Sequence, residues 1–272
     1  MQENHWQLSN GHSIPSLGCG CFNCFGEEMV SAIRWALEYG YRYIDSAAIY
    51  KNESEVGAAV AESSTSRHEL FLLSKLWPTN YENAESSLAK TLKDLRTDYL
   101  DAYLLHWPGT DEPKRLGAYE QLLSLQQKGL LKSIGVSNFG VDQLDKIYEE
   151  FGEYPVINQI ECHPSYQQKD LAAYCRQKGI QVIDYRPLNR GTYLTSPIIC
   201  EMAKKYGKTP SQIVLRWHVE QQQIPIPKSS NRGRIRENTE LFDFHLTSEE
   251  MEEIGRFETG IRSGSDPLTF NG

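Results

Sequence analysis

Short apolar segments alternate with amphipathic helical patterns about eight times along this chain of 272 residues. Most of the apolar segments are bounded by Gly, Pro, Asn or Ser, which is typical of buried parallel strands. Parallel strands joined by helices form an open doubly wound sheet or a closed barrel, and a count of about eight favours closure. No change in composition marks a linker, so we expect one domain over 1–272, an α/β fold of the (β/α)8 TIM barrel type. Its strands are expected at 14–18, 41–45, 70–74, 100–105, 132–136, 156–160, 181–185 and 224–227.

Additional elements are expected at both ends of this barrel. Asn10-Gly11 lies between alternating residues that begin at Trp6, which predicts a β-hairpin that closes the bottom of the barrel. Thr209 is followed three positions later by Gln212, and Thr247 in the same way by Glu250, so each pair is readable as a capping box. We therefore expect an extra helix before the last strand and another near the C-terminus.

The overall charge and the cysteines limit the classes of function. The formal net charge is -8, which disfavours binding to nucleic acid or to an anionic membrane. The first residues lack the pattern of a signal peptide, and no segment approaches a membrane-spanning apolar run, so a cytoplasmic protein with reduced cysteines is expected. Cys21 and Cys24 form a lone Cys-x-x-Cys without a second pair. We expect no metal site there, and interpret both as wall residues of a loop.

Ionisable side chains gather where the expected strands end. Asp45 ends the second strand, Lys75 the third and His106 the fourth, and Tyr50 follows Asp45 in the next loop. A free tyrosine has a pKa of about 10, too high for an efficient acid near neutrality. A neighbouring ammonium would lower that pKa, and a carboxylate would hold the ammonium in place. These four residues are candidates for acid catalysis at a carbonyl group, with His106 orienting the carbonyl oxygen or sharing the proton.

Aromatic residues accompany these polar ones. Phe22 follows the first expected strand, Trp77 follows Lys75, and Trp107 follows His106. An apolar pocket with a few polar groups is the usual form of a small-molecule site. We expect Phe22, Trp77, His106 and Trp107 to contact a substrate.

The segments around these residues resemble the aldo-keto reductase family. The likeness lies in 40–47 with Tyr50, in 73–77 and in 104–108, and extends over nearly the whole chain. The resemblance implies a (β/α)8 barrel, commonly monomeric, that reduces aldehydes or ketones with NADPH. It also implies Tyr50 as proton donor, Lys75 and Asp45 as the pair that tunes it, and His106 as the substrate-orienting group.

Later segments resemble the parts of the family that hold the cofactor. The resemblance implies that Ser137, Asn138 and Gln159 bind the nicotinamide carboxamide and that Tyr185 stacks on the ring. Independently, Lys228, Arg232, Arg234 and Arg236 bring four cations to an otherwise acidic chain just before an expected helix, an arrangement suited to a phosphate. Taken alone, the same four cations are equally typical of a solvated basic face. With the family resemblance, the 2′-phosphate of NADP(H) is the expected target. The complete expected set for NADPH (NADP+) is Ser137, Asn138, Gln159, Tyr185, Arg186, Leu188, Lys228, Ser229, Ser230, Asn231, Arg234, Glu237 and Asn238.

Some positions depart from the family pattern. Tyr43 stands where His is common, and Ser46 where Thr is common, without threat to the chemistry. Arg186 replaces a usual serine, and we hypothesise that it adds a charged contact to the cofactor or else points outward. The segment after His106 and the tail 264–272 are short, which suggests the microbial type with short loops and an open, broadly specific pocket.

Competing interpretations have weaker support. Gly18-x-Gly20 lacks the third glycine of a dinucleotide-binding Rossmann turn, and Tyr174 with Lys178 lies within an amphipathic helix. The segment 135–140 lacks the second glycine of a hydrolase nucleophile elbow. A non-catalytic NADPH-binding module of the same fold is the remaining alternative, and the complete set of four ionisable residues argues against it. The natural substrate, the direction of the reaction and the use of NADH stay open.

Overall fold

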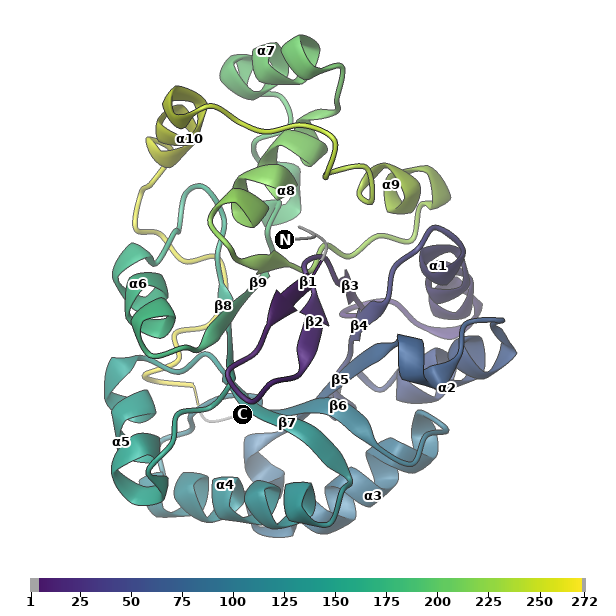
Figure 1. Cartoon of the computed structure of the whole chain (residues 1–272), viewed down its shortest axis with the longest axis vertical. Coiled ribbons are helices and arrows are strands. Elements are labelled where there is room, and N and C mark those ends of the chain that lie inside the picture. Colours follow the sequence, from purple (N-terminus) through teal and green to yellow (C-terminus); the bar gives the residue numbers. More distant parts are fainter. Residues whose placement is uncertain (1–4, 271–272) are drawn as a thin grey trace.

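A closed barrel of parallel strands forms the centre of the molecule (Figure 1). The computed structural model describes residues 5–270. Eight strands follow one another in chain order around the sheet, and each pairs in parallel with its neighbours. Backbone hydrogen bonds of 3.1 Å from Gly18 to Pro225 and from Gly20 to Pro227 join the first strand to the last segment. The expected barrel is therefore confirmed. Its strands are β3 (Cys19–Gly20), β4 (Tyr43–Asp45), β5 (Phe71–Leu76), β6 (Leu100–Leu105), β7 (Leu131–Ser137), β8 (Ile157–Glu161), β9 (Gln181–Tyr185) and β10 (Ile224–Pro225).

Helices surround the barrel on its outside (Figure 1). Both expected capping boxes are present, with Thr209 at the start of α8 and Thr247 at the start of α10. In each, the threonine side chain accepts a backbone N–H while the third residue returns a bond to the backbone, which fixes the helix start. The extra helices predicted before the last strand and near the C-terminus are confirmed. The helices are α1 (Gly26–Glu38), α2 (Glu53–Glu62), α3 (Ala84–Asp94), α4 (Glu112–Gln127), α5 (Val141–Phe151), α6 (Lys169–Gln177), α7 (Pro197–Tyr206), α8 (Pro210–Glu220), α9 (Arg232–Glu237) and α10 (Ser248–Gly255).

The predicted hairpin is present, but the first barrel strand was expected in the wrong place. β1 (His5–Gln7) pairs antiparallel with β2 (Ser13–Pro15), so that Trp6 lies opposite Ile14. The segment 14–18 thus begins in the hairpin, and the barrel strand starts only at Cys19. The reason is that Ile14 and Leu8 are buried against the inner side chains of the barrel, where the hairpin closes one end. An apolar run that plugs a barrel has the same pattern as one that forms its wall.

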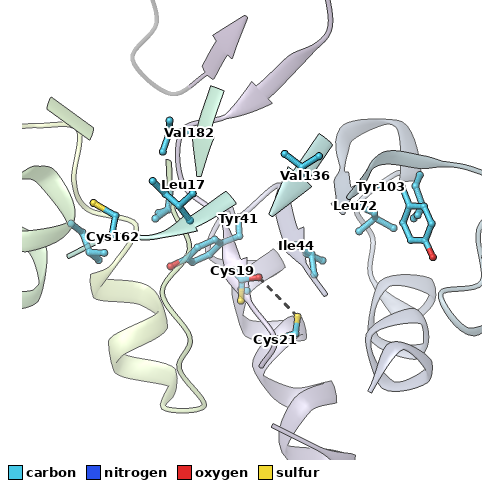
Figure 2. Close-up of a cluster of buried hydrophobic side chains, with 14 of the residues drawn as sticks. Leu17, Cys19, Cys21, Tyr41, Ile44, Leu72, Tyr103, Val136, Cys162 and Val182 are labelled. Carbon is cyan, nitrogen blue, oxygen red and sulfur yellow. Dashed lines mark hydrogen bonds between the residues drawn. The ribbon is translucent and has the colours of Figure 1, made fainter. Parts of the chain in front are cut away.

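Alternate side chains of each strand point into the barrel and out to the helices. The inner cluster contains Tyr43, Leu73, Leu104, Ile157 and Ile183. The outer cluster fills the space between sheet and helices, and Figure 2 shows part of it, with side chains from several strands. Because side chains alternate along a strand, the residue two positions after each of these also points inward. These next residues are Asp45, Lys75, His106, Gln159 and Tyr185. The sequence therefore brings the candidate site residues together on one rim of the barrel.

Within residues 5–270, no helix is both long enough and apolar enough to cross a membrane.

Candidate active site

A buried ion pair lies at the centre of the site. The Lys75 Nζ is 2.5 Å from Asp45 Oδ1 and also donates to the Ser46 carbonyl oxygen at 2.8 Å. The second Asp45 oxygen accepts hydrogen bonds from the Tyr43 hydroxyl at 3.1 Å and from Gln159 Nε2 at 2.5 Å. Both charged side chains are almost completely shielded from solvent. The carboxylate is thus satisfied on both oxygens, as a buried charge must be.

Tyr50 lies beside this pair on the short 3-10 helix Ala48–Tyr50. Lys75 Nζ donates to its hydroxyl at 3.3 Å. Burial raises the pKa of Tyr50, and although the Lys75 ammonium lowers it, the effect of burial is larger. The expectation of a pKa below the ordinary value was therefore wrong in its net direction. The pKa of Lys75 is raised despite burial, because Asp45 and Tyr50 favour the ammonium.

His106 faces the same space from β6. Its ring lies edge-on to Tyr50 at 5.7 Å and to Trp77 at 5.0 Å between centroids. Burial, together with the charge of Lys75, holds the pKa of His106 well below its usual range, so the imidazole is neutral. Among the residues that the structure describes, none makes a hydrogen bond to its buried Nδ1. A neutral imidazole can offer one N–H donor to an oxygen atom without carrying charge.

Hydroxyl and amide side chains from β7, β8 and β9 form a hydrogen-bonded group next to His106. Ser137 Oγ donates to the Gln159 carbonyl oxygen at 2.9 Å, and Asn138 Nδ2 donates to the His106 carbonyl oxygen at 3.0 Å. The Tyr185 hydroxyl donates to Asn138 Oδ1 at 2.7 Å. The structure thus brings together the four residues expected at the nicotinamide end, and the aromatic ring of Tyr185 is held at the edge of the polar group.

The chain is similar to known proteins over almost its whole length. The model of the Aldo/keto reductase family matches residues 17–258. The chain belongs to this family. It is 43% identical over 268 residues to methylglyoxal reductase DkgA of Escherichia coli (strain K12), with 98% of each chain covered. It is 39% identical over 264 residues to glyoxal reductase of Bacillus subtilis (strain 168), covering 96% of this chain and 95% of that protein.

A solved structure supports the same assignment. The Bombyx mori aldo-keto reductase in complex with NADP superposes with a TM-score of 0.90 at 36% identity, covering 96% of this chain and 95% of that one. This aldo/keto reductase is therefore an oxidoreductase that acts on carbonyl groups, and the family resemblance inferred from the sequence is confirmed.

The cations expected at the adenosine end are not equivalent in this reductase. Arg232 forms an ion pair with Glu38 at 2.9 Å and a hydrogen bond with the Tyr39 hydroxyl at 2.7 Å. Arg236 lies 3.5 Å from Glu240. Within residues 5–270, neither Lys228 nor Arg234 forms an ion pair, so no carboxylate of the protein competes there with an anionic ligand.

The rest of this segment lies between β10 and the end of α9. Asn231 caps α9 by accepting the backbone N–H of Arg234, whose guanidinium lies 3.4 Å from the Ser229 hydroxyl. Ser230 is half-buried, Glu237 ends α9, and Asn238 is buried directly after it. Their contacts with a cofactor stay predictions.

Arg186 makes a contact that the sequence did not predict. Its guanidinium donates to the Ser263 hydroxyl at 3.1 Å and so reaches the C-terminal tail. Its backbone adopts a φ of 55°, in the left-handed region, directly after Tyr185. Leu188, two residues later, packs against the outer hydrophobic cluster. Contact of Arg186 or Leu188 with a cofactor stays a prediction.

Aromatic rings line the space above Tyr50 and His106. Phe22 lies edge-on to Tyr50 at 5.2 Å between ring centroids, and Trp77 is edge-on to His106. Sequence reasoning missed Phe270 of the C-terminal tail, whose ring lies 4.4 Å from that of Trp107 and 5.8 Å from that of Trp77. The expectation of an open pocket did not take the Phe270 ring into account. The length of the tail gave no signal of its path, because the path depends on hydrogen bonds to the barrel rim.

All six cysteines of the part of the chain from 5 to 270 are free thiols, and five of them are buried. Cys19, Cys21 and Cys24 are buried free thiols, and burial raises the pKa of Cys19 to about 12. One group of possible metal ligands, Cys162, Asp184 and His218, has its ligand atoms within 4.8 Å of one another. Both ring nitrogens of His218 are already hydrogen-bonded, to Asp184 at 2.6 Å and to the Pro187 carbonyl at 3.2 Å. We therefore interpret the group as a buried hydrogen-bond network between β9 and α8.

Proposed function

We propose that this aldo/keto reductase uses NADPH to reduce small aldehydes, methylglyoxal among them, and that Tyr50 is the proton donor. The observation that carries the proposal is the chain of hydrogen bonds from Asp45 through Lys75 to the Tyr50 hydroxyl, beside a neutral His106. A similar protein from Escherichia coli is named methylglyoxal reductase, and one from Bacillus subtilis glyoxal reductase. Both names describe compact aldehydes, and the aromatic rings of Phe22 and Trp77 lie next to Tyr50 and His106, where such a substrate would react.

The side chains at the rim suit a nicotinamide dinucleotide. Ser137, Asn138 and Gln159 bring one hydroxyl and two side-chain amides to this rim, groups that can exchange hydrogen bonds with a carboxamide, and Tyr185 brings a ring for stacking. Lys228 and Arg234 supply charge for a 2′-phosphate, which favours NADPH over NADH. A similar aldo-keto reductase from Bombyx mori was solved in complex with NADP. When bound, NADPH supplies a hydride to the carbonyl carbon of the substrate.

The residues of this chain then provide for the carbonyl oxygen. His106 donates its single N–H to that oxygen and orients it, because a neutral imidazole binds without competing as an acid. Tyr50 keeps its proton through neutral pH, since its pKa is raised. As the oxygen acquires negative charge, it becomes a stronger base than a phenolate and takes the proton of Tyr50. Lys75 stabilises the phenolate that is left, Asp45 holds Lys75 in place, and a proton from solvent restores the phenol.

Substitution Tyr50→Phe tests this assignment. The variant keeps the ring and loses only the hydroxyl, so we expect turnover of methylglyoxal to fall by about 10²–10⁴-fold, the range typical of a lost general acid. The dissociation constant of NADPH, measured by nicotinamide fluorescence, is expected to stay unchanged. Wild-type turnover in Tyr50→Phe would show that another group donates the proton. Tight NADPH binding by the wild type, with no oxidation of NADPH by any carbonyl in a panel, would favour the non-catalytic module.

A further inference from the structure

A second buried carboxylate, Glu161, lies on the rim and plays no part in the chemistry proposed above. Its side chain is completely buried, yet among residues 5–270 no lysine or arginine forms an ion pair with it. One oxygen accepts the backbone N–H of Ser263 at 2.7 Å and the Ser263 hydroxyl at 2.5 Å. The other accepts the backbone N–H of Gly264 at 2.9 Å. The charge of Glu161 is therefore satisfied mainly by the C-terminal tail.

A histidine completes the environment of this carboxylate. The ring nitrogen Nε2 of His163 lies 3.2 Å from Glu161, and the other ring nitrogen faces the hydroxyls of Tyr193 at 3.0 Å and Ser165 at 3.2 Å. The donors outweigh the effect of burial and lower the pKa of Glu161 to about 2. The carboxylate is ionised and accepts only, so His163 donates to it through Nε2. We call Glu161, His163, Ser263 and Gly264 the tail anchor.

The tail anchor has a steric requirement at Gly264. A Cβ atom added there would lie 2.6 Å from Glu161 Oε2 and 3.2 Å from Arg186 Nη1. Any side chain there would force either the Glu161 carboxylate or the tail to shift, because real Cβ atoms do not approach other heavy atoms so closely. The tail therefore passes the rim at a residue without a side chain, close enough for both backbone N–H groups to reach Glu161.

The same strands carry the tail anchor and the group expected at the nicotinamide. Glu161 follows Gln159 by two positions on β8, so both point inward, and it lies opposite Tyr185 of β9. Arg186, the residue after Tyr185, also donates to Ser263. After α10 the tail passes beside β8 (Figure 1). It is thus tied to the ends of β8 and β9 before it continues across the rim.

Beyond the anchor, the tail continues to the aromatic residues Trp77 and Trp107. A turn brings the backbone N–H of Phe270 to the Asp266 carbonyl oxygen at 3.0 Å. The Phe270 ring then contacts Trp107 and Trp77, which come from the ends of β6 and β5. Phe270 therefore reaches the side of the rim away from β8 and β9, and its position depends on where the tail is held.

We propose that Glu161 is a positioning residue that fixes the C-terminal tail through Ser263 and Gly264, so that Phe270 forms the outer wall of the substrate pocket. The consequence is a preference for aldehydes with an apolar group beyond the carbonyl. This inference rests on the proposed function for its kinetic part only, since the position of the tail can be measured without turnover.

The substitution Glu161→Gln tests the proposal with two related substrates. It keeps the size of the side chain but places an amide NH2 against the N–H donors of the tail. Phenylglyoxal and methylglyoxal share the same reacting group and differ only in a phenyl in place of a methyl. For phenylglyoxal we expect KM to rise about tenfold with kcat within about twofold, the signature of lost binding to a wall. KM for methylglyoxal and the dissociation constant of NADPH are expected to change little.

A readout without turnover follows the tryptophans. When the tail detaches, Trp77 and Trp107 lose the Phe270 cover, so acrylamide quenching of tryptophan fluorescence is expected to increase to the level of the variant Phe270→Ala. Adding Glu161→Gln to Phe270→Ala is expected to change phenylglyoxal KM no further, because both changes remove the same wall. The matched control is Glu253→Gln, an exposed carboxylate on α10, which is expected to behave as the wild type in every assay.

The outcomes separate the two proposals. Unchanged quenching and unchanged phenylglyoxal KM in Glu161→Gln would overturn the role of Glu161. A rise in the NADPH dissociation constant as large as the rise in phenylglyoxal KM would overturn it too. If Glu161→Gln fails to fold, Gly264→Ala disturbs the same contact from the tail side, with the same expected shifts. A wild-type protein that reduces neither aldehyde would refute the proposed function, and the quenching measurement alone would then decide on the tail anchor.

Discussion

The variant Lys75→Met isolates the energetic cost of the ion pair at the centre of the site. Methionine keeps an unbranched side chain and removes the ammonium, which is fully buried against Asp45. Removing one partner of a buried pair costs about 3–5 kcal/mol, because the other charge stays buried. Asp45 keeps two donors, Tyr43 and Gln159, so we expect the lower end, about 3 kcal/mol. With roughly 2 °C for each kcal/mol in a chain of this size, the melting temperature is expected to fall by about 6 °C.

The assay is a double-mutant cycle followed by thermal unfolding and circular dichroism. Asp45→Asn in the Lys75→Met background removes the orphaned charge, so the double variant is expected to be more stable than the sum of the single changes predicts, by about 2 kcal/mol. Lys90→Met is the control, since the Lys90–Asp94 pair is largely exposed on α3 and is worth less than about 1 kcal/mol. Additive single changes, or a Lys75→Met variant as stable as Lys90→Met, would refute the reasoning.

Three further predictions follow from the same geometry. Because burial depresses the pKa of His106, a plot of wild-type kcat against pH is expected to show no inflection near the ordinary histidine value of about 6.5. An inflection there would mean that the imidazole titrates during turnover. Lys228→Ala or Arg234→Ala is expected to weaken NADPH about tenfold and NADH little, measured as dissociation constants, and equal losses would remove the 2′-phosphate assignment. Gly135→Ala is expected to destabilise the barrel by about 1–3 kcal/mol in thermal unfolding, since the added Cβ would lie 2.5 Å from Leu104 Cδ2. A variant as stable as the wild type would show that the side chains around Gly135 repack without cost.

Much of the fold follows from local patterns that the sequence displays directly. The strand that ends at Asp45, the turn at Asn10-Gly11 and the caps at Thr209 and Thr247 each depend on residues close together in the chain. Asp45, Lys75 and His106 could be placed together for the same reason, because each occupies the end of a parallel strand. The start of the first barrel strand could not be predicted, since Ile14 is equally apolar whether it plugs the barrel or forms its wall.

The sequence did not predict two kinds of feature at the site. One is the balance of opposing effects on a pKa, and the other is the path of the C-terminal tail across the barrel rim. Whether the pKa of Tyr50 rises or falls is decided by the extent of burial against the distance to Lys75, and neither quantity is visible in the order of residues. The family resemblance implied a role for Gln159 and none for Glu161, two residues later on the same strand. The partners of Glu161 in the tail stand about a hundred positions away and are mostly backbone N–H groups, which every non-proline residue carries. A contact made by the backbone leaves almost no trace in side-chain patterns, apart from the glycine that it requires at Gly264.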